Sequence, residues 1–176
     1  MMNGISTLLG QIGGTINIDI IYRNLLEQNI ALGTGMWSPW NFRDFVTSGG
    51  IWDYKIRYNQ AGRRNTIWGY VNIGTQEKTN FSFQGQTMEA QDIGNHHFGV
   101  VGKACGLFPE NTLLVEAGRA QMTDKTSKPE WQKYNIVHTP QGDVQGIMLP
   151  PYGDDPRDQY WIQAGFDYFK NRSQRP

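Results

Sequence analysis

One short stretch of the chain combines groups that can transfer protons with closely spaced glycines. Residues 92–99 read Asp-Ile-Gly-Asn-His-His-Phe-Gly, and further glycines follow at positions 102 and 106. Glycine inside a helix or strand costs up to about 1 kcal/mol relative to alanine. Its repetition therefore indicates a sharp turn or the close approach of a ligand or a second backbone. The pattern predicts either the floor of a functional site or close helix packing through small residues around a satisfied histidine.

The histidines of this stretch are candidates for acid–base chemistry. His97 is the best general acid or base by residue type, because imidazole titrates near neutral pH. On a helix His96 and His97 point about 100° apart, so we expect one to face inward and the other outward. The remaining histidine, His138, is distant in the chain, and no His-Glu-x-x-His or Cys-x-x-Cys spacing occurs. The sequence therefore predicts no catalytic metal and no other cofactor.

Three carboxylates near these motifs could also carry chemistry. Glu89 and Asp92 lie three residues apart, while Asp53 belongs to Trp-Asp-Tyr-Lys at 52–55, where Asp53 and Lys55 share one face of a strand. Cleavage of a glycoside commonly uses one carboxylic acid to protonate the leaving oxygen and a second carboxylate as base or nucleophile. We expect Asp53 to pair with Asp92 or Glu89. The ordinary alternatives are a surface ion pair for Asp53 and Lys55 and a helix cap for Asp92.

The elements that must position these residues are mainly helices. Helices are expected from Asp19 to Ile30, from Ser38-Pro39, from Met88 onward, from Pro109, and from Asp155-Pro156. Aromatic and β-branched residues between 51 and 84 predict a small antiparallel sheet, and residues 123–150 are expected to form an irregular loop or lid. The predicted fold class is α+β: a mainly helical single domain with a small antiparallel β-sheet. It spans residues 19–176 and follows an N-terminal arm over residues 1–18.

Composition narrows the classes of partner. The 176 residues carry 16 Lys and Arg against 16 Asp and Glu, whereas a dedicated nucleic-acid binder usually has a basic excess. The many aromatic rings could stack on sugars or on exposed bases. No stretch approaches the roughly 20 apolar residues that span a bilayer, and the N-terminus lacks the pattern of a signal peptide. We therefore expect no stable membrane insertion, and export by a route other than a standard signal peptide.

Four blocks in order resemble the polymorphic toxin type 44 (bacterial toxin 44) family. They are Gly-Ile-Trp-Asp-Tyr-Lys at 50–55, Gly-Asn-His-His-Phe-Gly at 94–99, Ala-Gly-Arg-Ala-Gln at 117–121 and Tyr-Gly-Asp-Asp-Pro-Arg-Asp-Gln at 152–159. Members of this family are typically the C-terminal warheads of large secreted proteins used in competition between bacteria. The resemblance implies a toxin with a secretion-system carrier and a cognate immunity protein. It also matches the family's Asp and Lys with Asp53 and Lys55, and its Gly-Asn pair with Gly94 and Asn95.

These features together predict an antibacterial effector enzyme. The leading reaction is hydrolysis of the peptidoglycan glycan strand in the target-cell periplasm. The alternative is a metal-independent ribonuclease acting in the target-cell cytoplasm, with His97 as general base and Lys55 stabilising phosphate charge. A basic patch around Arg57, Arg63, Arg64 and Lys78 would favour that alternative, and a non-enzymatic binding module is a third reading. The catalytic candidates are Asp53, Asp92, Glu89 and His97, and the substrate-binding candidates are Lys55, Asn95 and Gln121.

Overall fold

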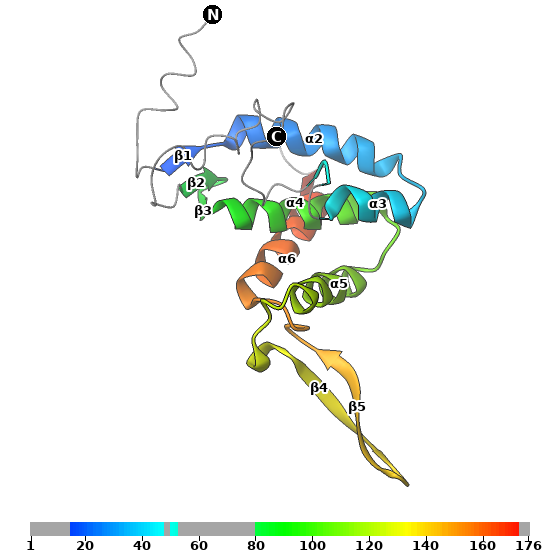
Figure 1. Cartoon of the computed structure of the whole chain (residues 1–176). Helices are drawn as coiled ribbons and strands as arrows, with labels where there is room; N and C mark the ends of the chain where they lie inside the picture. The colour runs from blue at the N-terminus through cyan, green and yellow to red at the C-terminus, as the bar shows by residue number, and fades with distance from the viewer. Residues whose placement is uncertain (1–14, 48–49, 53–79, 173–176) are drawn as a thin grey trace, which may run out of the picture.

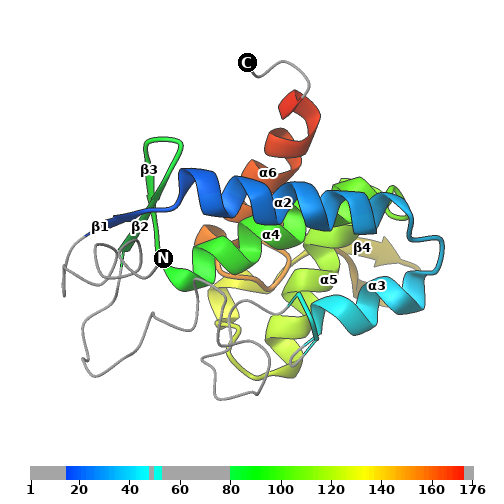
Figure 2. The same cartoon turned by 90° about the horizontal axis from the view of Figure 1, so that it is seen from above.

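A central helix surrounded by four others forms the body of the protein. The structure, a computed structural model, describes residues 15–47, 50–52 and 80–172. Helix α4 (Ala90–Cys105) lies at the centre, as Figures 1 and 2 show. Around it pack α2 (Asp19–Thr34), α3 (Pro39–Val46), α5 (Glu110–Thr123) and α6 (Pro156–Asn171). This architecture confirms the mainly helical α+β class.

Several helix ends lie where the sequence predicted them. Pro39 occupies the first turn of α3 after Ser38, and α5 starts directly after Pro109. Asp155 caps α6, because its side chain accepts a hydrogen bond of 2.8 Å from the backbone N–H of Arg157. Helix α2 differs slightly, since its N-cap is Ile18. The side chain of Asp19 accepts a hydrogen bond of 2.6 Å from the backbone of Gln84 instead.

A small mixed sheet lies at one end of the helical body. Strand β1 (Thr15–Asn17) runs parallel to β2 (Asn80–Phe83), which pairs antiparallel with β3 (Gln86–Met88). Gln84 and Gly85 both have positive φ, as the tight two-residue turn between β2 and β3 requires. The end of the predicted N-terminal arm therefore contributes a strand. The part of the predicted sheet at positions 53–79 lies outside the described residues.

The expectation of an irregular loop over residues 123–150 was wrong for most of its length. A short 3₁₀ helix, η2 (Pro129–Trp131), leads into strand β4 (Lys133–Thr139), which pairs antiparallel with β5 (Gly142–Leu149). Proline and glycine near residue 140 mark the turn of a hairpin rather than a structureless segment. The hairpin projects well away from the helices in Figure 1. Its strands carry exposed Ile136 and Ile147.

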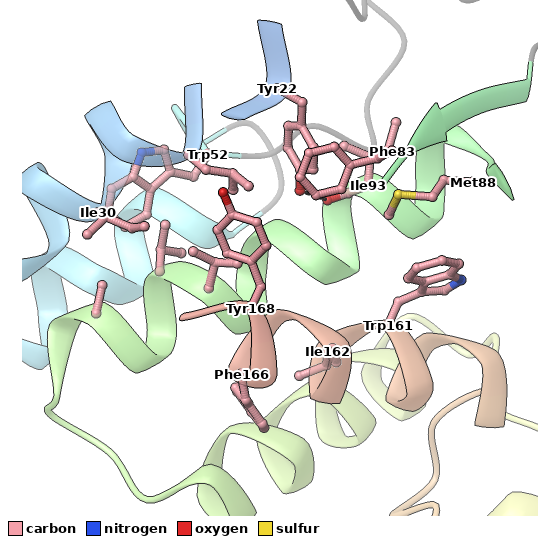
Figure 3. Close-up of a cluster of buried hydrophobic side chains, with 14 of the residues drawn as sticks. Tyr22, Ile30, Trp52, Phe83, Met88, Ile93, Trp161, Ile162, Phe166 and Tyr168 are labelled. Atoms are coloured by element: carbon pink, nitrogen blue, oxygen red, sulfur yellow. Dashed lines mark hydrogen bonds between the residues drawn. The ribbon is translucent and has the colours of Figure 1, made fainter. Parts of the chain in front are cut away.

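Apolar side chains from every side enclose α4. Ile93, Val100 and Val101 of α4 are fully buried, as are Tyr22 of α2 and Phe166 of α6. Aromatic rings link the sheet to this core (Figure 3): the Phe83 ring centroid lies 4.8 Å from that of Tyr22 and 5.7 Å from that of Tyr168. Across the described residues, no helix has the length and hydropathy to span a membrane.

The recurring glycines let α4 and α6 touch backbone to backbone. A β-carbon on Gly99 would collide with the carbonyl oxygen of Ile162, and one on Gly165 would collide with the carbonyl oxygen of His96. Rigid backbone atoms cannot move aside as a flexible side chain can. At this position the second interpretation of the glycine spacing, close helix packing, describes the contact.

Replacing either contact glycine should separate the two helices. We expect Gly165→Ala to lower the free energy of unfolding by about 3 kcal/mol, at the upper end of the range for overpacking a core. Urea denaturation followed by circular dichroism measures this loss. Gly35→Ala is the matched control, because a β-carbon there meets its neighbours at ordinary contact distances of 3.6 Å or more. Equal stability of the two variants would contradict the backbone contact.

Candidate functional site

Two of the three predicted carboxylates, Glu89 and Asp92, contact Arg157 where α4 and α6 begin. Glu89 is the N-cap of α4 and forms a reciprocal capping box with Asp92, whose Oδ2 accepts the Glu89 backbone N–H at 2.6 Å. Arg157 donates from Nε to Asp92 Oδ1 at 2.8 Å and from Nη2 to Asp92 Oδ2 at 2.6 Å. A third bond, 3.3 Å long, joins Arg157 Nη1 to Glu89 Oε1.

This cluster ties two helix starts together. The side chain of Asp92 is fully buried and both of its oxygens accept hydrogen bonds. These contacts fit the role of a helix cap better than that of a free acid. The same bonds to Asp92 raise the pKa of Arg157 and keep its guanidinium charged. Arg157 was not among the predicted site residues, although it lies in the block at 152–159. An arginine following an N-cap aspartate and proline was the available signal.

Both histidines of α4 are buried, which corrects the expectation that one would face outward. His96 Nδ1 lies 2.9 Å from the Tyr22 hydroxyl, which also donates to the carbonyl of Ile93 at 3.2 Å. Asn29 Nδ2 donates to His97 Nε2 at 2.8 Å, an arrangement that requires a neutral imidazole. Burial, followed by the nearby His96 charge, lowers the pKa of His97 to about 3. A helix enclosed on all sides has no outward face for either ring.

Trp52 places the start of the first family block against this buried region. Its ring lies 5.7 Å from that of His97 and 4.9 Å from that of Phe45, and its backbone N–H donates to the Phe45 carbonyl at 2.9 Å. The side chain is buried, as Figure 3 shows. Asp53 and Lys55 follow directly in the chain but lie outside the described residues. Their predicted meeting with Asn95 and His97 stays a prediction.

Asn95 differs from the other polar residues of α4. It is buried, and its Nδ2 has no hydrogen-bond partner among the residues that the structure describes. Unpaired buried donors are costly, so such a group normally meets an acceptor such as a water molecule or a ligand. Its predicted role in binding substrate is therefore chemically possible and remains a prediction.

The remaining family blocks hold α5 and the start of α6 together. Gln121 Oε1 accepts the backbone N–H of Asp155 at 3.0 Å, and Gln159 Nε2 donates to Asp154 Oδ2 at 2.6 Å. A β-carbon on Gly118 would collide with the carbonyl oxygen of Tyr152. Gln121, predicted to bind substrate, thus has a structural partner. Within the described parts of the chain, no three His, Cys, Asp or Glu side chains gather as metal ligands would.

The comparison with protein families settles the relationship that the four blocks indicated. The family model for bacterial toxin 44 matches residues 41–171. The chain belongs to the bacterial toxin 44 family. Membership confirms the predicted toxin role. It is consistent with delivery into target cells and suggests a cognate immunity protein. No curated protein and no solved structure matches the chain.

The Asp92–Arg157 contact should be energetically coupled. We expect Arg157→Ala to lower the free energy of unfolding by about 3 kcal/mol, because it leaves a buried carboxylate without its cation. Asp92→Asn should cost less, since the Arg157 left behind is partly exposed. The double variant should be at least about 1 kcal/mol more stable than the sum of the single effects. Urea titrations measure all three values.

An exposed ion pair provides the control for that cycle. Arg119 and Glu116 are 2.6 Å apart but both side chains are more than half exposed, so their coupling should stay below about 0.5 kcal/mol. A coupling energy between Asp92 and Arg157 no larger than that of this surface pair would show that the cluster does not join the helices.

His97 should make the fold sensitive to acid. In the unfolded chain its imidazole binds a proton below a pKa of about 6.5, whereas the folded protein excludes that proton down to a pKa of about 3. The free energy of unfolding should therefore fall as pH falls from 6.5, by about 2 kcal/mol at pH 5. His97→Gln should lose this part of the pH dependence, measured by urea titration at pH 5, 6 and 7. His138→Gln, an exposed histidine, should keep it, and identical slopes for both variants would contradict the assignment.

Proposed function

We propose that this toxin hydrolyses the glycan strand of peptidoglycan, with Asp53 as a catalytic carboxylate. The toxin role follows from the family, and the reaction is the proposal. Glycoside hydrolysis suits the chain because it needs carboxylates and no metal. The formal net charge of zero also favours a substrate less densely charged than nucleic acid.

The state of His97 is the observation that carries this choice. A general base must come within hydrogen-bond reach of the proton it removes, directly or through one water molecule. His97 is fully buried, its Nε2 already accepts from Asn29, and its pKa is about 3. His96 is also buried and contacts Tyr22. Imidazole chemistry within the family blocks is therefore disfavoured, and carboxylate chemistry is the better supported alternative.

Trp52 and Glu89 refine the proposed catalytic pair. Trp52 packs between Phe45 of α3 and His97 of α4, so the residue directly before Asp53 in the sequence has a defined position beside α4. Of the two predicted partners, Glu89 has a side chain that is 21% exposed, whereas Asp92 has none exposed. Arg157 Nη1 lies 3.3 Å from Glu89 Oε1, so a cation lies beside this partly exposed carboxylate. We assign Asp53 the part of proton donor and Glu89 the part of the carboxylate base.

A ribonuclease is the second candidate, favoured by the distribution of charge along the sequence. Residues 53–79 include Lys55, Arg57, Arg63, Arg64 and Lys78 but only Asp53 and Glu77 as acids. Such a local basic excess is typical of surfaces that contact phosphates. In this case killing would take place in the cytoplasm, with Lys55 stabilising the phosphate charge.

Killing in different compartments separates the two functions. The full chain is expressed in a susceptible bacterium with and without an added export signal. We expect lysis only with export, and release of soluble glycan fragments from purified sacculi by the purified protein. Asp53→Asn and Glu89→Gln should each slow this release by at least about 100-fold, the usual contribution of an acid–base group.

The control variant is Asp124→Asn, which alters an exposed carboxylate at the end of α5. It should digest sacculi at the rate of the unmodified protein. Intact sacculi together with fragmented RNA and killing without export would overturn the wall-hydrolase proposal in favour of the ribonuclease.

A further inference from the structure

Two exposed tryptophans stand at the start of α3. Trp37 and Trp40 expose 84% and 69% of their surface, far more than is usual for the largest apolar side chain. Leu32, at the end of α2, is also exposed at 55%. Only Ser38 and Pro39 lie between the two tryptophans, so their Cα atoms are at most about 11 Å apart.

Buried side chains anchor the segment that carries these two rings to the core of the protein. Phe42 is buried, and its ring packs against those of Phe98 and Phe108 at centroid distances of 5.9 Å. Met36 Sδ lies 3.9 Å from Cys105 Sγ at the end of α4. A fixed backbone presents the tryptophans in one arrangement, which lowers the entropy lost when a ligand binds.

The charge of this surface limits what it can bind. No Lys, Arg, Asp or Glu occurs from Gln28 to Phe42, and the polar side chains exposed there are Gln28, Thr34 and Asn41. The next charged residues, Arg43 and Asp44, are exposed one turn after Trp40 and carry opposite charges, so they add no net charge to the surface. Nucleic acids and anionic membrane surfaces both require Lys or Arg for binding. A neutral sugar chain instead matches uncharged rings bordered by hydroxyl and amide groups.

We infer that Trp37 and Trp40 form a binding subsite for a neutral glycan strand, on which sugar rings stack. The inference rests on the proposed function, because it assigns this surface to the substrate of the same enzyme. Helix α3 connects the two: Trp40 lies on its exposed side, while Phe45 contacts Trp52, the residue before Asp53. The subsite would hold the strand while cleavage takes place at a neighbouring sugar. Figures 1 and 2 show α3 on the outside of the helical body, and in Figure 1 it lies apart from the β4–β5 hairpin.

Binding can be tested apart from cleavage. The Asp53→Asn protein is mixed with peptide-free glycan strands, and the bound fraction is measured by co-sedimentation or tryptophan fluorescence. We expect the added double change Trp37→Ala/Trp40→Ala to weaken binding at least about tenfold, or about 1.4 kcal/mol. The melting temperature should not change, because both rings are exposed. Tyr160→Ala, at an aromatic residue of α6 that is 53% exposed, is the matched control and should bind normally.

The outcomes distinguish this inference from the proposed reaction. Tryptophan-dependent binding without any digestion of sacculi would support the subsite and contradict the hydrolase. Digestion with unchanged glycan binding by the double variant would overturn the subsite alone. Stronger tryptophan-dependent binding to RNA or to lipid vesicles than to glycan would also overturn it. So would a double variant that binds glycan normally and has lost only its binding to the immunity protein.

Discussion

The backbones of α4 and α6 meet at Gly99 and Gly165, where neither residue has space for a β-carbon. This contact brings the carbonyl groups of each helix against the other and leaves no room between them for larger side chains. Helices that touch this closely fix the positions of all side chains nearby, because packed interiors deform little. The placement of Asp92 beside Arg157, and of His96 beside Tyr168, follows from it.

Enclosure of α4 has a cost, because the helix carries polar groups into the core. Buried polar groups are tolerated when they are hydrogen-bonded, and α4 obtains partners from both neighbours. Arg157 of α6 serves Asp92, while Tyr22 and Asn29 of α2 serve His96 and His97. Helix α2 lies before residue 41, where the family match begins. The family's central motif therefore depends, in this chain, on residues outside the matched region.

Local signals in the sequence were enough to predict the helices but not the surroundings of their side chains. Ser38-Pro39 and Asp155-Pro156 correctly predicted the starts of two helices, because capping depends on a few adjacent residues. The hairpin at 133–149 was missed because its Pro140 and Gly142 also suit an irregular loop. The histidines were misjudged because burial depends on what packs around a helix. A signal did exist: no charged residue occurs between Asp92 and Lys103, which is unusual for a helix with an exposed face.

The second, third and fourth family blocks share one physical role in this structure. They join α4, α5 and α6 through backbone contacts at Gly99 and Gly118 and through hydrogen bonds at Gln121, Arg157 and Gln159. Asp92, which is fully buried and bonded to Arg157, is poorly suited to exchange protons with a substrate, since doing so would break a contact that holds the helices. The first block differs, because its buried Trp52 is the anchor and its ionisable residues come after the anchor. A rigid scaffold that ends in a fixed tryptophan is a sound basis for positioning a reactive carboxylate. The proposed assignment of catalysis to Asp53, and of strand binding to the exposed end of α3, rests on that division.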